Sequence, residues 1–157
     1  MGFDAAYEQK KMTPADAAGL VRDGDTIVVP TGVGEPPALL TALSARRQSL
    51  HGVTVSQILP LRKYAYFDEA TRANIRHTVY FFGGPSRPGG QAGWVDFLPA
   101  YFSELPQLIA RGLSPADVVF SMASPMDEHG YFALSLAPDY TMAALAKARA
   151  IVLEVNP

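Results

Sequence analysis

The chain has 157 residues, of which 48% are hydrophobic and 18% are charged, and its formal net charge is −2. This length and composition are typical of one folded domain with a buried core, and they exclude a disordered chain. The sequence contains no cysteine, which excludes disulfides, thiolate catalysis and a cysteine-based zinc site.

Helical patterns alternate with short apolar runs along the chain. In chain order, we expect helix 3–11, helix 15–21, strand 26–29, helix 36–48, strand 53–59, helix 69–74, strand 79–82, helix 102–111, strand 118–122, strand 131–136, helix 140–149 and strand 151–155. Such alternation predicts the α/β class, with a mostly parallel sheet flanked by helices.

Two local signals support these boundaries. Thr13 followed by Pro14 is typical of a helix start, with a capping hydroxyl and a proline in the first turn. Residues 83–93 are rich in glycine and proline and predict a loop, of a length at which loops are often functional. We expect one domain over residues 1–157. Because 151–155 has the apolar pattern of a central strand and the sequence ends two residues later, we expect a fragment of a longer chain.

The sequence also limits location and macromolecular partners. Lysine and arginine form no cluster of the kind that marks nucleic-acid binding. The N-terminus is polar and acidic, unlike a signal peptide. The apolar runs fall far short of the about 20 residues that span a bilayer. We therefore expect a cytoplasmic protein with no nucleic-acid or membrane partner.

A glycine-bearing segment, residues 30–37, lies between a predicted strand and a predicted helix. Ligands bind at that end of the strands in open α/β sheets, and unpaired N–H groups at a helix start attract anions. The segment lacks the Lys-Ser/Thr of a Walker loop, and Pro37 replaces the third glycine of a dinucleotide motif. A plain strand-to-helix turn explains the segment equally well. The helix dipole alone favours an acidic residue such as Glu35 there.

A second polar segment, residues 124–132, contains three adjacent functional side chains, Asp127, Glu128 and His129. Consecutive side chains diverge, so one metal ion does not easily bind all three, and we expect no metal site. His129 is the best acid/base candidate, because His51 and His77 precede predicted strands and are interpreted as surface residues. From spacing alone, a simple turn before a strand is the favoured interpretation.

Arg87 is the third candidate, within residues 83–93. Its guanidinium can bind a carboxylate or phosphate through two hydrogen bonds. A solvated loop arginine is an equally good interpretation. No Gly-x-Ser-x-Gly motif and no histidine-rich metal set occurs. Taken alone, the residues therefore indicate a ligand-binding α/β domain.

Four segments, in matching order and spacing from about residue 12 onward, resemble the acetyl-CoA hydrolase and 4-hydroxybutyrate-type CoA-transferase family. They are Val29-Pro30-Thr31-Gly32-Val33-Gly34-Glu35-Pro36, Val95-Asp96-Phe97-Leu98-Pro99 with Ser103-Glu104-Leu105-Pro106, Asp117-Val118-Val119 with Ser124-Pro125-Met126-Asp127-Glu128-His129-Gly130-Tyr131-Phe132, and residues 148–157. The resemblance covers nearly all of this chain and about the first third of the usual family protein. Glu35 and the Gly/Pro-rich loop around Arg87 depart from the pattern we expect of the family.

The resemblance implies two related α/β domains of the sugar-phosphate-isomerase kind, of which this chain is the N-terminal one. It implies that a glutamate of the second domain attacks the acyl-CoA thioester and passes CoA to a carboxylate, or that water takes the acyl group in hydrolases. No glutamate of this chain aligns with that nucleophile, including Glu35, Glu104, Glu128 and Glu154.

The resemblance also implies the site and its partners. We expect no catalytic residue, no metal and no permanently bound cofactor in this chain, and coenzyme A as a substrate. The expected substrate-binding residues are Thr31, Gly32, Val33, Gly34, Glu35, Arg87, Asp127 and His129. Expected partners are an acyl-CoA, a small carboxylate, the C-terminal catalytic domain or subunit, and further copies of the same protein.

Two other functions fit parts of the sequence. A non-catalytic module that binds an acyl-CoA or a carboxylate, or serves as an assembly subunit, would explain the missing glutamate. A sugar-phosphate isomerase of the same broad fold would use the glycine loop for phosphate and the pair Asp127 and His129 as acid and base.

Overall fold

A computed structural model describes residues 2–134 and 136–156. Within them, six strands form one sheet in the order β4-β3-β2-β1-β5-β6, and every neighbouring pair is parallel. The strands are β1 (Thr26–Val28), β2 (Val53–Gln57), β3 (Ile75–Val79), β4 (Val95–Phe97), β5 (Val118–Ala123) and β6 (Ala150–Val155). The expected α/β fold is therefore confirmed.

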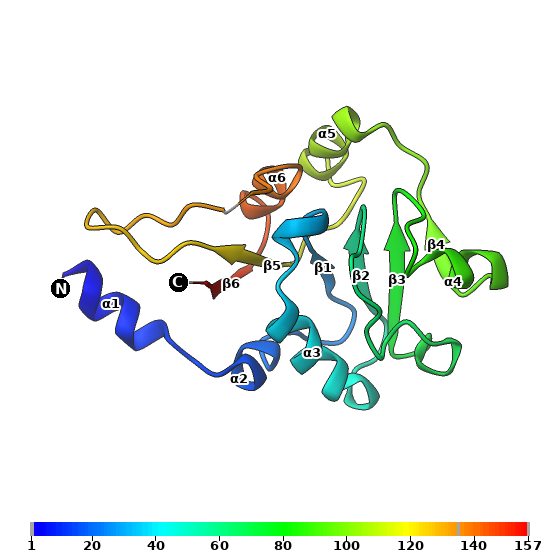
Figure 1. The fold of residues 1–157 in the computed structure, drawn as a ribbon, viewed down its shortest axis with the longest axis horizontal. Coiled ribbons are helices and arrows are strands. Elements are labelled where there is room, and N and C mark those ends of the chain that lie inside the picture. The colour runs from blue at the N-terminus through cyan, green and yellow to red at the C-terminus, as the bar shows by residue number, and fades with distance from the viewer. Residues whose placement is uncertain (1, 135, 157) are drawn as a thin grey trace.

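Helices cover both faces of the sheet, as Figure 1 shows. In the described residues these are α1 (Phe3–Lys10), α2 (Pro14–Ala18), α3 (Pro37–Ala45), α4 (Arg87–Ala92), α5 (Leu105–Ala110) and α6 (Thr141–Leu145), with 3-10 helices η1 (Gly32–Gly34), η2 (Arg47–Ser49), η3 (Glu69–Thr71) and η4 (Phe102–Glu104). Leu40 and Leu43 of α3 belong to the same buried cluster as Val55 on one face. On the other face, Ile109 of α5 shares a cluster with Val119.

The strand expected at residues 79–82 is wrong in position. β3 begins at Ile75 and ends at Val79, where the prediction began. Its buried residues alternate with the polar residues Arg76 and Thr78, so the following apolar run gave the stronger but misleading signal.

His77, expected at the surface, lies instead in the middle of β3 and is 2% exposed. Its ring packs edge-on against Phe67, with 4.2 Å between ring centroids. Neither ring nitrogen has a hydrogen-bond partner among the described residues. Burial lowers the pKa of His77 to about 3, so the imidazole is neutral and fills a core position.

Residues 83–93 do not form the expected loop, because α4 occupies Arg87–Ala92. Two glycines bring this helix close to its neighbours. A Cβ on Gly90 would lie 2.2 Å from the Phe82 ring, and one on Gly89 would lie 2.4 Å from Val95. The glycines therefore allow the helix to pack closely against its neighbours. A glycine-rich composition fits such a helix and a loop equally well.

The strand expected at residues 131–136 is also wrong, since no strand forms at residues 131–134 or 136. Residues 124–133 are instead a narrow loop, closed by the Ser124 N–H donating to the Ala133 carbonyl at 2.9 Å.

The last strand, β6, lies at an edge of the sheet and is not central. Within the part of the chain that the structure describes, it pairs with β5 alone. The N–H groups of Ala150 and Asn156 donate toward the β5 side, to Asp117 and Ala123. By alternation, the main-chain groups of residues 151, 153 and 155 point away from β5.

Candidate functional site

The sheet reverses its winding direction between β1 and β5. Strands β1 to β4 follow one another toward one edge, whereas β5 returns to the other side of β1. In open parallel sheets the crevice beyond the carboxyl ends at such a reversal is the usual ligand position. The glycine loop, residues 29–36, follows β1 there, and its 3-10 helix η1 packs beside β5.

Hydrogen bonds hold the glycine loop in place. Four of its N–H groups donate within the protein: Thr31 to Asp139 Oδ2 (2.9 Å), Gly32 to the Leu59 carbonyl (3.0 Å), Gly34 to the Thr31 carbonyl (3.1 Å) and Glu35 to the Gly32 carbonyl (3.0 Å). Among the described residues, the Val33 N–H is the one N–H of Thr31–Glu35 without an acceptor. The Val33 side chain is 54% exposed.

The start of α3 is occupied by a carboxylate of the protein itself. Pro36 and Pro37 have no N–H, and the next two N–H groups, of Ala38 and Leu39, donate to Glu154 Oε2 at 2.9 and 3.0 Å. Glu154 comes from β6 and supplies the negative charge that a helix N-terminus favours. The expected open anion site at this helix start is therefore filled.

Glu35 points into the protein. It is 5% exposed, and its Oε2 accepts hydrogen bonds from Gln57 Nε2 (2.9 Å) and the Leu61 N–H (3.1 Å). Its Oε1 accepts from the Tyr64 hydroxyl at 2.6 Å. Gln57 also donates to the Pro30 carbonyl at 3.1 Å. This network joins the ends of β1 and β2.

Tyr140 joins the same two strand ends from the other face of the sheet. Its hydroxyl donates to the Val29 carbonyl and accepts from the Ile58 N–H at 3.1 Å. Burial raises the pKa of Tyr140 well above its usual value, so the hydroxyl keeps its proton. The glycine loop is thus fixed from both faces.

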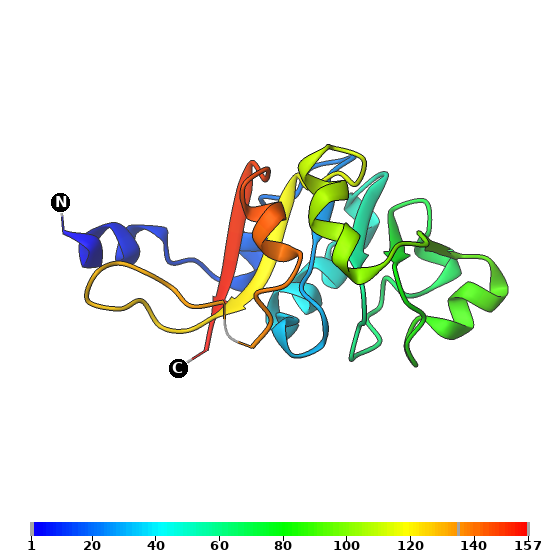
Figure 2. The ribbon, with the colours of Figure 1, turned by 90° about the horizontal axis from the view of Figure 1, so that it is seen from above.

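Asp127 and His129 lie in the narrow loop of residues 124–133. This loop runs beside α1 and projects with it from the body of the sheet (Figures 1 and 2). Asp127 Oδ1 accepts from the N–H groups of His129 and Tyr131 at 2.9 and 2.8 Å, so it shapes the turn. The His129 side chain is exposed, with Nε2 3.5 Å from Glu128.

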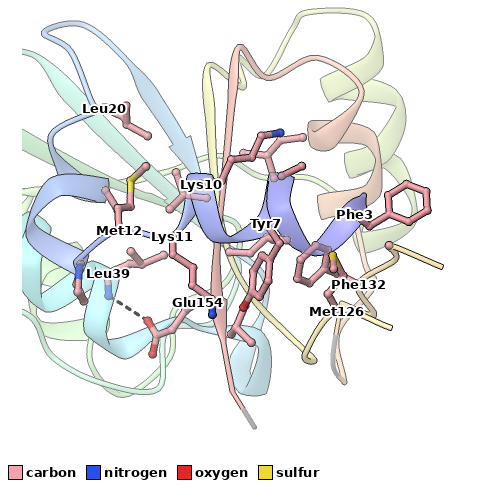
Figure 3. A pocket seen from close by; sticks show the side chains of 18 residues that line it. Phe3, Tyr7, Lys10, Lys11, Met12, Leu20, Leu39, Met126, Phe132 and Glu154 are labelled. Atoms are coloured by element: carbon pink, nitrogen blue, oxygen red, sulfur yellow. Dashed lines mark hydrogen bonds between the residues drawn. The ribbon is translucent and has the colours of Figure 1, made fainter. Parts of the chain in front are cut away.

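The projecting loop and α1 are joined by aromatic contacts. The rings of Tyr7 and Phe132 meet edge to face at 5.6 Å, and a Cβ on Gly130 would lie 2.6 Å from the Phe3 ring. Below them, Figure 3 shows α1 crossing over β6 above a cavity of about 780 Å³. None of the site residues expected from the sequence lines this cavity.

Arg87 is in the first turn of α4. This helix lies beside β4, at the other end of the sheet from the loop that follows β5 (Figure 1). The Arg87 guanidinium donates to the Phe82 carbonyl at 3.3 Å. It borders a second hollow of about 510 Å³, whose other walls include Phe81 and Phe97. The structure therefore brings Thr31–Glu35 together and leaves Arg87, Asp127 and His129 apart from them.

Sequence reasoning missed Asp139, Tyr140 and Glu154, which hold the glycine loop and α3, because their partners are distant in sequence. It also missed Arg62 and Lys63, which follow β2 and are exposed. Two adjacent basic residues after a predicted strand were the available signal.

No group of His, Cys, Asp or Glu suited to a metal ion occurs among residues 2–134 and 136–156. None of the helices described there is long and apolar enough to cross a membrane.

Comparison with known proteins assigns the chain to a family. A family model described as the acetyl-CoA hydrolase/transferase N-terminal domain matches residues 1–157. Over 155 residues the chain is 43% identical to succinyl-CoA:cyclohexane-1-carboxylate CoA transferase of Geobacter metallireducens, covering 99% of this chain and 35% of that protein. It is 29% identical over 156 residues to 4-hydroxybutyrate coenzyme A transferase of Clostridium kluyveri, covering 99% and 36%. The chain thus spans about a third of the length of these relatives.

Solved structures show the same fold. The crystal structure of RipA from Yersinia pestis matches with a TM-score of 0.87 at 29% identity, over 99% of this chain and 38% of that one. A 4-hydroxybutyrate CoA-transferase from Porphyromonas gingivalis matches with a TM-score of 0.71 at 24% identity, over 98% and 35%. The family match over all of residues 1–157, the relatives and the fold agree. The chain belongs to the acetyl-CoA hydrolase/transferase family as its N-terminal domain.

Proposed function

We propose that the chain is the N-terminal part of an enzyme that moves CoA between an acyl-CoA and a carboxylic acid, or that hydrolyses the acyl-CoA. The nucleophile is a glutamate supplied by a second domain. The observation that carries the proposal is the fixed glycine loop at the winding reversal, in a chain that matches this family over its whole length. The two named CoA transferases above support the transferase reaction.

The proposed reaction passes through two covalent intermediates on the glutamate. The glutamate carboxylate attacks the thioester carbonyl, the C–S bond breaks, and an acyl-glutamyl anhydride and CoA thiolate result. The thiolate attacks the glutamyl carbonyl, which releases the acyl group as a carboxylate and leaves a glutamyl-CoA thioester. An acceptor carboxylate then attacks the glutamyl-CoA thioester, which gives a second acyl-glutamyl anhydride and CoA thiolate. The thiolate attacks the acyl carbonyl of this anhydride, which forms the new acyl-CoA and frees the glutamate. In a hydrolase, water takes the acyl group.

This chain contributes one wall of the cleft. The Val33 N–H, which lacks an acceptor within the described residues, donates to a substrate oxygen, and Thr31, Gly32 and Gly34 set its position. Glu35 acts from behind this wall, since its carboxylate is buried. Arg87, Asp127 and His129 lie outside this crevice, and substrate binding by them stays a prediction. Self-association also stays a prediction.

Trapping of the covalent intermediate tests the proposal. The full-length protein is incubated with succinyl-CoA without acceptor, reduced with borohydride, digested and examined by mass spectrometry. We expect the modification on a glutamate outside residues 1–157, and no turnover by residues 1–157 alone. Modification of a glutamate within residues 1–157, or thioester cleavage by this chain alone, would refute the division of labour.

A non-catalytic binding module is the second candidate. One observation favours it: in this structure the carboxylates of Glu35 and Glu154 are both engaged by donors of the protein. The same experiment separates the two functions. Saturable binding of succinyl-CoA by the full-length protein without any adduct or transfer would select the binding module.

A further inference from the structure

The segment after β2, residues 58–64, is fastened to the crevice at three points. The Ile58 N–H donates to Tyr140, and the Leu59 carbonyl accepts from Gly32. The third point is Glu35, which accepts from the Leu61 N–H and from the Tyr64 hydroxyl. An irregular segment needs such contacts to keep one conformation, because it has no strand or helix partners of its own.

Glu35 is suited to hold a segment and unsuited to bind a substrate. Both of its oxygens are engaged, by three donors, and the side chain lies under the loop. Burial, followed by the hydrogen bond to Glu35, raises the pKa of Tyr64 well above its usual value. Tyr64 therefore remains protonated and keeps donating, and hydrogen bonds to a charged acceptor are among the stronger ones in proteins.

Between these fastened points, the segment presents three exposed side chains at the carboxyl edge. Leu61 is 54% exposed, and Arg62 and Lys63 are also exposed. Neither cation forms an ion pair within residues 2–134 and 136–156. The backbone that carries them lies beside the glycine loop, because Leu61 and Tyr64 on either side of them donate to Glu35. Two unpaired cations at a crevice attract an anionic ligand.

We propose that Glu35 is a positioning residue, which clamps residues 58–64 so that Arg62 and Lys63 meet an anionic group of the acyl-CoA. This inference rests on the proposed function for the identity of the ligand. The chemistry recognised is a phosphate or carboxylate oxygen, and CoA supplies the former while a dicarboxylic acyl group such as succinyl supplies the latter.

The test uses the full-length protein and a matched pair of tyrosines. Tyr64→Phe removes the hydroxyl that binds Glu35. Tyr66→Phe is the control, because the neighbouring Tyr66 is also buried and stacks on Tyr64 at 5.6 Å, but its hydroxyl has no partner among the described residues. We expect Tyr64→Phe and Glu35→Gln to speed amide hydrogen exchange in residues 58–64 and to raise KM for succinyl-CoA about threefold or more with kcat preserved. Tyr66→Phe should change neither.

The cations are tested directly. Arg62→Gln with Lys63→Gln should raise KM about tenfold and remove most of its salt dependence, with hydrogen exchange unchanged. Lys147→Gln, an exposed charge beyond α6, is the control and should leave KM unchanged. Replacing succinyl-CoA by butyryl-CoA separates the two anions: an equal rise in KM assigns the phosphates of CoA, and a smaller one assigns the carboxylate.

Two results would overturn the inference in an active enzyme: equal behaviour of Tyr64→Phe and Tyr66→Phe in both measurements, or an unchanged KM in the Arg62/Lys63 variant. If the wild-type protein neither transfers CoA nor hydrolyses the acyl-CoA, the proposed function fails instead. The hydrogen-exchange comparison of the two tyrosine variants then still decides whether Glu35 acts as a clamp.

Discussion

His77 makes the stability of this fold depend on pH, because a neutral imidazole is buried between aromatic rings in the middle of β3. Its pKa is lowered by burial from 6.5 to about 3. In the unfolded chain the same imidazole binds a proton as the pH falls through 6.5. The unfolded state therefore holds one more proton than the folded state between about pH 6.5 and pH 3, and folding stability falls as pH falls through that window.

The size of the effect follows from the shift. Each pH unit in which the two states differ by one proton is worth about 1.4 kcal/mol. Between pH 7 and pH 5 the loss from His77 alone is therefore about 2 kcal/mol. Other groups add their own pH dependence, so the contribution of His77 is measured as a difference between two proteins.

The variant His77→Leu is the suitable partner, because it is close to histidine in volume and cannot bind a proton. It also removes two ring nitrogens that have no hydrogen-bond partner among the described residues, so it should fold at least as well at pH 7. Urea unfolding of both proteins at several pH values, followed by the fluorescence of the single tryptophan, Trp94, gives the two free energies of unfolding.

We expect the stability difference between the variant and the wild type to grow in favour of the variant by about 2 kcal/mol from pH 7 to pH 5. A difference that is the same at both pH values would refute the reasoning, since it would mean that His77 binds its proton equally well in the folded and unfolded states.

Three further predictions concern packing, helix capping and the strand ends, and each is measured as a change in the free energy of unfolding. Gly90→Ala should cost about 1–3 kcal/mol, because its Cβ would overlap the Phe82 ring; Gly84→Ala, where nothing lies within 4 Å, should cost little, and equal costs would contradict this explanation. Glu154→Gln should cost about 0.5–1 kcal/mol through the weaker interaction with the start of α3, and a cost that does not shrink in high salt would argue against a charge effect. Tyr140→Phe should cost about 1–3 kcal/mol, because its hydroxyl bridges the ends of β1 and β2; a neutral substitution would show that water replaces the bridge.

The sequence was sufficient for the fold class and for most strands, because apolar, β-branched runs such as those of β1 and β5 report burial directly. It was not sufficient where one residue type is compatible with two different local structures. Glycines predicted a loop at residues 83–93, whereas Gly89 and Gly90 bring α4 against its neighbours. The half-polar pattern of β3 concealed a strand whose polar residues Arg76 and Thr78 alternate with the buried ones.

For the site, the sequence located the glycine loop but not its chemistry. The expectation of several unpaired N–H groups depended on partners that only tertiary structure supplies, such as Asp139 for Thr31 and Glu154 for α3. These pairs are more than 100 residues apart, and no local pattern connects them. The same limit applies to Glu35, which was expected among the substrate-binding residues and whose hydrogen bonds show its carboxylate to be internal.

The outer edge of β6 has a practical consequence for work with this domain. Its six residues, AIVLEV, contain no proline and no lysine, and such residues are among the usual means by which natural edge strands avoid pairing with other chains. A sample in which this edge is left uncovered is therefore prone to concentration-dependent aggregation through strand pairing. Ile151→Lys, at a residue that is 49% exposed, is a simple way to keep such a sample dispersed for spectroscopy and crystallisation.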